Sequence, residues 1–152
     1  MRHNEDLIDL NLNIVRYGVG RNLSTAEREY VQNLPFCLAK LKPTAEVLRS
    51  FVSATAETRH PKNSLDVISI NRDYLNFARL VAKDILAGST EEMVMVNLTW
   101  DQAVLLSGLT NKKITHIAAC WEGLVFSFQS TTIARGAELH PFAALYHAAA
   151  LQ

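Results

Sequence analysis

Five polar side chains in one short stretch have the chemistry needed to contact nucleic acid. Residues 108–118 read GLTNKKITHIA. Lysine can reach guanine edges or phosphates, asparagine suits adenine, and threonine contacts bases or the backbone. If the stretch forms a helix, one face of it carries all of these groups. The candidates for DNA contact are Asn111, Lys112, Lys113, Thr115 and His116.

Such side chains work only on a helix that a second helix holds in place. Residues 98–118, LTWDQAVLLSGLTNKKITHIA, predict this helix-turn-helix arrangement. We expect Thr99 and Thr110 to cap helices over 100–106 and 111–118. Gly108 lies in the turn between them, where we expect a positive φ.

Apolar residues spaced along the pair are expected to hold the two helices together. Val104 stands where a small alanine is usual, because the second helix crosses closely there. The pattern also fits an alternative, a helical hairpin inside a dimer core, in which Lys112 and Lys113 are only solvated surface charges. The expected apolar positions are Leu98, Val104, Leu109, Ile114 and Ile117.

The elements around the pair predict a mainly α fold, a multi-helix domain in which two short β-strands flank the helix-turn-helix-like pair. The polar segment 57–64 contains a proline and predicts a linker. It would separate an N-terminal helical region, 1–60, from a domain over 65–152. Helices are expected over 5–20, 25–34 and 70–86, from Pro43 and over 142–151, with a short helical turn over 35–41 and strands over 92–97 and 124–130.

Helix 70–86 has an apolar face too wide for one neighbour. We expect a homodimer in which a second copy covers this face through a two-fold interface. The alternative is that residues 1–65 fold back over it, because LIDLNLNIVRY and VISINRDYLNF are similar enough for a degenerate duplication. The predicted interface consists of Ile70, Tyr74, Phe77, Val81 and Ile85.

Composition limits the classes of function. Fifteen Lys and Arg balance fifteen Asp and Glu, so the chain is neutral and is expected to bind DNA weakly by itself. His116 and Cys120 are too few for a metal site, and neither a phosphate-binding loop nor a catalytic constellation is present in the sequence. We therefore expect no enzyme activity, no cofactor and no membrane span, and a cytoplasmic protein with reduced cysteines.

From Ile70 to about Ile133 the order of elements resembles FlhD, the bacterial flagellar transcription activator subunit. The residues that carry the resemblance are INRDYLNFARLVAKDIL, LTWDQAVLLSGLTNKKITHIA and LVFSF. The resemblance implies a helical, dimerising protein that acts with an FlhC-like subunit on promoter DNA and, through the complex, on RNA polymerase. The alternative is a dimeric protein-interaction adaptor or antitoxin-like module that makes no direct DNA contact.

Overall fold

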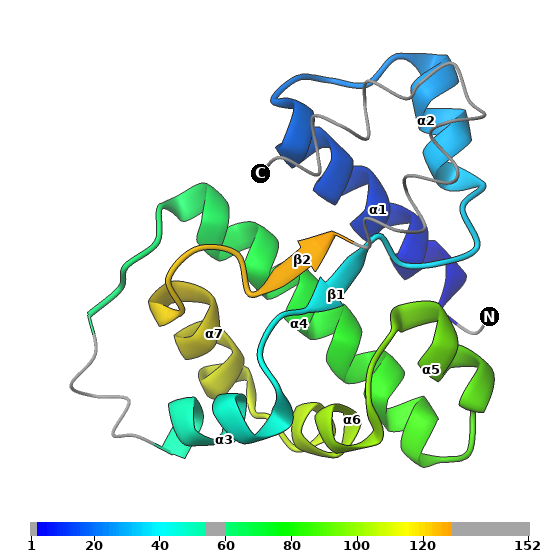
Figure 1. Ribbon diagram of the computed structural model, residues 1–152. Helices are drawn as coiled ribbons and strands as arrows, with labels where there is room; N and C mark the ends of the chain where they lie inside the picture. Colours follow the sequence, from blue (N-terminus) through cyan, green and yellow to red (C-terminus); the bar gives the residue numbers. More distant parts are fainter. Residues whose placement is uncertain (1–2, 54–59, 129–152) are drawn as a thin grey trace.

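The computed structural model describes residues 3–53 and 60–128, which form seven helices and two short strands (Figure 1). This confirms the mainly α class with two short strands. The helix expected over 142–151 lies outside the described residues. In chain order the elements are α1 (Asn4–Val19), α2 (Thr25–Gln32), β1 (Ala39–Leu41), α3 (Ala45–Ser53), α4 (Leu65–Leu86), α5 (Thr90–Val96), α6 (Trp100–Ser107), α7 (Asn111–Cys120) and β2 (Phe126–Phe128).

Helix α4 is the centre of the fold and packs against α1, α5, α6 and α7. In Figure 1 it crosses the middle of the molecule, with α1 and α2 on one side and α3, α6 and α7 on the other. One hydrophobic cluster takes residues from both sides of the expected linker, including Leu7, Ile14 and Leu41 together with Leu75 and Leu106. The described parts of 1–60 and 65–152 therefore share a single core.

The apolar face of α4 is not available to a second copy, which corrects the interface expected from the sequence. Helix α1 packs on α4 within the same chain, and the start of α1 is fastened to the end of α4 by a hydrogen bond between His3 Nε2 and Asp84 Oδ2. The alternative in which the N-terminal region covers the stripe is the arrangement found. The homodimer itself stays a prediction. The five residues proposed for its interface are all buried within one chain and offer no exposed surface: Ile70, Tyr74, Phe77, Val81 and Ile85.

The similar sequence segments in α1 and α4 each contain a buried asparagine, and the two asparagines make the same kind of hydrogen bonds. Asn11 Nδ2 donates to Phe36 O, and Asn11 Oδ1 accepts from Leu38 N, both at 2.9 Å. Asn71 repeats the pattern: its Nδ2 donates to Gly123 O and its Oδ1 accepts from Val125 N, again at 2.9 Å. In each case one carboxamide holds a carbonyl and the amide two residues later, just before a strand.

The two strands held in this way pair with each other. β1 and β2 are antiparallel, with Lys40 opposite Ser127 at the centre of the register. Because α1 and α4 also run antiparallel, with the start of α1 bonded to the end of α4, the α1–β1 and α4–β2 units are related by an approximate two-fold axis.

The strand partners differ from those expected. Residues 92–97 were expected as a strand, but Thr90–Val96 is helix α5, with Glu91 and Glu92 in its first turn where carboxylates favour the positive end of the helix dipole. The turn of helix expected over 35–41 is absent, because Asn11 takes the backbone groups of Phe36 and Leu38 and the chain continues as β1. A short run such as 92–97 has little preference for a strand where no neighbouring strand pairs with it.

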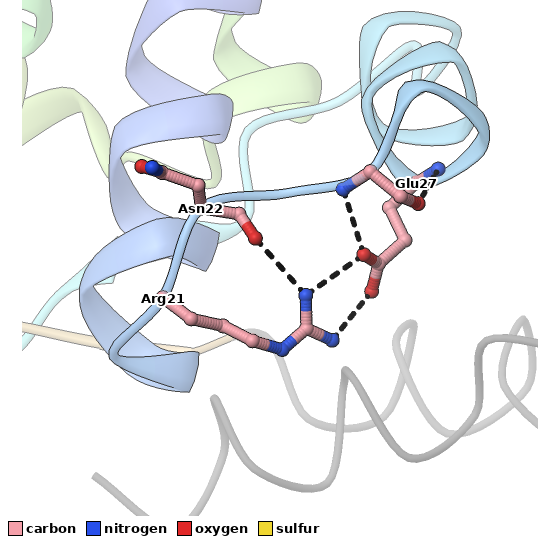
Figure 2. A network of polar contacts seen from close by, with 4 residues as sticks. Arg21, Asn22 and Glu27 are labelled. Atoms are coloured by element: carbon pink, nitrogen blue, oxygen red, sulfur yellow. Dashed lines mark hydrogen bonds and ion pairs between the residues drawn. The ribbon is translucent and has the colours of Figure 1, made fainter.

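Helix α2 begins with a capping box. Ser24 Oγ accepts from Glu27 N at 3.2 Å, and Glu27 Oε1 accepts from Ser24 N at 2.9 Å. Arg21 adds a bidentate ion pair, in which Nη1 and Nη2 each lie 2.9 Å from an oxygen of the Glu27 carboxylate (Figure 2). The hydrogen bonds from Arg21 and then from the Ser24 amide lower the pKa of Glu27 to about 2.

Both cysteines lie in the core. Burial raises the pKa of the Cys37 thiol to about 12, and Cys120 is also buried. Neither forms a disulfide. The thiolate is the reactive form of cysteine, so Cys37 is inert in the folded chain.

Candidate nucleic-acid interface

The helix pair forms, and both of its caps are the threonines predicted. Thr99 Oγ1 accepts from Gln102 N at 3.1 Å, and Thr110 Oγ1 accepts from Lys113 N at 3.2 Å. The helices α6 and α7 begin at the expected residues, Trp100 and Asn111, and extend one and two residues further than expected. Local capping chemistry is enough to set these starts.

The turn between α6 and α7 does not need its glycine. Gly108 has φ −93° and ψ −1°, an ordinary helical conformation, so the expected positive φ is wrong. A Cβ at Gly108 would meet the Leu105 carbonyl at 3.7 Å and the Val104 carbonyl at 4.0 Å, both ordinary van der Waals distances. The turn is made by hydrogen bonds from Gly108 N to Leu105 O and from Leu109 N to Leu106 O.

Val104 does not lie in the contact between the two helices, contrary to the expectation that it is one of the apolar residues that hold them together. It is 46% exposed, whereas its neighbour Ala103 is fully buried and supplies the small side chain on the inner face of α6. Helices α6 and α7 both pack extensively on α4, which holds them in common. The remaining apolar positions of the pair are buried as expected: Leu98, Leu109, Ile114 and Ile117.

Arg79 of α4 fastens the pair at its turn. Its Nη1 donates to Leu109 O at 3.0 Å, and its Nη2 donates to Asn111 Oδ1 at 2.7 Å. Nη2 also lies 3.3 Å from Asn76 Oδ1 on α4. One guanidinium therefore ties α4 to the last residue before the cap and to the first residue of α7. Sequence reasoning missed Arg79, because nothing local in α4 marks a contact with a residue so distant along the chain.

The other end of α7 is fastened by two asparagines. Asn63 Nδ2 donates to Ala118 O at 2.9 Å and to Trp121 O, while Asn63 Oδ1 accepts from Gly123 N at 2.8 Å. Asn71 Nδ2 also reaches Ala118 O, at 3.3 Å. These bonds satisfy carbonyls that the last turn of a helix leaves without partners. Both ends of α7 are thus fixed, so its outer face is held rigidly.

Four of the five candidate DNA contacts lie on that outer face. Lys112, Lys113 and Thr115 are exposed, and no described hydrogen bond or ion pair occupies their side chains. Asn111 is exposed as well, but its Oδ1 already accepts from Arg79. An adenine would need that oxygen as an acceptor, so Asn111 is better placed to orient the helix than to recognise a base.

His116 faces inward, unlike the other four. Its ring is partly buried and lies 5.6 Å from the ring of Phe51 on α3, and Phe51 in turn packs edge-on against Trp121 at 5.5 Å. This aromatic contact joins α3 to α7. His116 therefore acts as a packing residue in the described fold, and it is a poor candidate for a base contact.

Comparison of the chain with protein families, with curated proteins and with solved structures finds no match. Within residues 3–53 and 60–128, no group of three His, Cys, Asp or Glu side chains is arranged to bind a metal ion. None of the described helices has both the length and the apolar character required to cross a bilayer. The geometry of α7 and of the residues that hold it is therefore the basis for a function.

Proposed function

We propose that this chain is an FlhD-like subunit of a transcription activator, which presents α7 to promoter DNA and acts with an FlhC-like partner. The observation that carries the proposal is the exposed face of Lys112, Lys113 and Thr115, on a helix fixed at its first residue by Arg79. A rigidly held helix with cations and a hydroxyl on its outer face has the form used for major-groove contact.

The position of the lysines adds to the electrostatic argument. Lys112 and Lys113 occupy the first turn of α7, where backbone N–H groups and the helix dipole already favour phosphate. Lysines there are unfavourable for an isolated helix, since they lie at the positive end of its dipole. A nearby phosphate would relieve this repulsion.

The neutral charge of the chain indicates a shared DNA-binding surface. Phosphate contacts supply much of the affinity of proteins for DNA, and two lysines are few. A basic FlhC-like partner would supply the remaining contacts, and RNA polymerase would be engaged by the complex. The chain alone is therefore expected to bind more weakly than about 10⁻⁸ M, a typical affinity for specific sites.

The test is the salt dependence of binding to a random-sequence DNA duplex. Fluorescence anisotropy of the intact chain would be measured from about 50 mM to about 200 mM salt. Lys112→Ala with Lys113→Ala removes two phosphate contacts, so the log–log slope should fall by about two. The matched control is Lys40→Ala with Lys42→Ala, which removes the same charge from exposed residues at β1.

Equal losses in the two double variants would show that only net charge matters and would contradict the proposed role of α7. Circular dichroism should show both variants folded, because all four side chains are exposed. An unchanged slope in the Lys112 and Lys113 variant would favour the alternative, an adaptor without direct DNA contact.

A further inference from the structure

A groove runs along the outer side of the α1–α4 pair. It consists of two adjoining hollows of about 220 Å³ and about 540 Å³, both lined by Asn13 and Asp73. Along α1 and its C-cap residue it extends from Asp6 to Gly20, which is about 21 Å at the rise of an α-helix. The groove is therefore long enough to seat about four turns of another helix.

The floor of the groove is apolar. Leu10, Phe77 and Ile70 line it but are at most 5% exposed, so the apolar surface open to a partner is that of Tyr17 at one end and Leu80 at the other. Leu80 is 41% exposed, although it is a large apolar residue on the central helix. Burial of the exposed part of Leu80 by a partner would be favourable at about 25 cal/mol per Å².

The rim of the groove is acidic. Four carboxylates line it, and Arg16 is the one cation among the lining residues described. His3 lies 3.7 Å from Asp6, so the charge at that end is partly balanced when the histidine is protonated. Partial desolvation raises the pKa of Asp73, while nearby Arg72 lowers it. A cation placed beside Asp73 would relieve the cost of that desolvated charge. The four carboxylates are Asp6, Asp9, Asp66 and Asp73.

The groove is linked to α7 by a short chain of hydrogen bonds. Asn76 lines the groove and accepts from Arg79, whose guanidinium also holds Asn111 and the Leu109 carbonyl. A molecule seated in the groove therefore lies beside the residue that fixes the start of α7. Phosphate would be repelled by the acidic rim, so the occupant differs from the ligand proposed for α7.

We infer that the α1–α4 groove is the docking site for a basic amphipathic helix of a partner protein. Apolar side chains of that helix cover Tyr17 and Leu80, and its lysines or arginines pair with the Asp rim. The inference deepens the proposed function, on which it rests for the existence of a partner subunit. A basic partner docked in this groove would lie next to α7 and would supply the positive charge that the neutral chain lacks.

The probe is a synthetic amphipathic helix of about 15 residues, with leucines on one face and lysines on the other. Its binding to the intact chain would be measured by fluorescence anisotropy. Asp9→Asn with Asp73→Asn should weaken binding about four- to tenfold, since each exposed ion pair contributes modestly. Glu29→Gln with Asp101→Asn removes two exposed carboxylates elsewhere and should change the affinity by less than about twofold.

A second pair of variants tests the apolar floor. Leu80→Gln should weaken peptide binding at least about threefold, because the apolar contact is lost. Val94→Gln is the matched control, since Val94 is 82% exposed on α5 and lies outside the groove. No binding of the peptide, or equal effects of the groove and control variants, would overturn the inference.

The two proposals fail separately. Groove variants should bind the DNA duplex like wild type, and the Lys112 and Lys113 variant should bind the peptide like wild type. If peptide binding follows the groove while DNA binding is insensitive to α7, the docking surface stands and the DNA contact falls. The opposite result removes the docking site and leaves the role of α7 intact.

Discussion

Replacement of Asn71 by alanine is the perturbation whose cost follows most directly from the structure. Asn71 is completely buried in α4. Its side chain donates to Gly123 O at 2.9 Å and to Ala118 O at 3.3 Å, and it accepts from Val125 N at 2.9 Å. The variant leaves these backbone groups without the partner that now satisfies them.

The expected loss of stability is several kcal/mol. A buried polar group that loses its partner costs about 1–3 kcal/mol. The Val125 amide and the Gly123 carbonyl are the groups most affected, because the bond to Ala118 is longer and Asn63 also donates to that carbonyl. We therefore expect Asn71→Ala to lower the free energy of unfolding by about 3–5 kcal/mol, with the cavity left by the amide included. That is a large part of the usual total of about 5–15 kcal/mol.

Urea unfolding followed by circular dichroism would measure the loss. Asn11→Ala tests the two-fold relation, since Asn11 makes the equivalent bonds before β1, and it should cost about 2–4 kcal/mol. Asn13→Ala is the control: Asn13 lies two residues further on α1 and, among the described residues, bonds to Arg16 at the surface, so the change should be below about 0.5 kcal/mol. A cost below about 1 kcal/mol for Asn71→Ala would refute the reasoning that this carboxamide anchors β2 and the end of α7.

Three further predictions concern the core and the α2 cap. Cys37 and Cys120 should react with a thiol-specific chromogenic reagent only when urea unfolds the chain, because both are buried and the pKa of Cys37 is raised to about 12. Rapid reaction in native buffer would contradict their burial. Glu27→Gln should cost about 1 kcal/mol at neutral pH. The folded pKa of Glu27 is about 2 against an ordinary 4.5, so the difference in free energy of unfolding between wild type and the variant should be complete above about pH 5 and disappear as the pH falls towards 2. Urea titrations that show the same difference at pH 7 and near pH 2 would exclude the ion pair as its cause. Phe77→Asp should unfold the chain rather than separate two folded copies, whereas Leu80→Asp should fold; a folded Phe77→Asp monomer seen by light scattering would mean that this face is an interface after all.

Features set by neighbours in sequence were predictable. Ser24, Thr99 and Thr110 cap helices because their hydroxyls reach an amide three residues on, and this geometry needs no tertiary contact. The exposure of Lys112 and Lys113 also follows from helical periodicity. These local signals located the candidate interface and both of its helices.

Features set by distant residues were not predictable in the same way. The pairing of β1 with β2 depends on Asn11 and Asn71, whose partners lie far along the chain. The cover over α4 depends on α1, so a wide apolar face in one helix could not reveal whether a second copy or the same chain would bury it. Arg79 looks like any solvated cation in the sequence, yet it fixes the start of α7.

Photocrosslinking from α7 tests the central claim, that the outer face of this helix lies against DNA. A photoactivatable amino acid would replace exposed Thr115, and in a control protein exposed Thr90 on α5, with each irradiated on a random-sequence duplex at about 50 mM salt. We expect covalent protein–DNA adducts from position 115 and few from position 90. Adducts from position 90 alone, or equal yields from both, would contradict the claim, as would their absence at 115 when anisotropy shows the duplex bound.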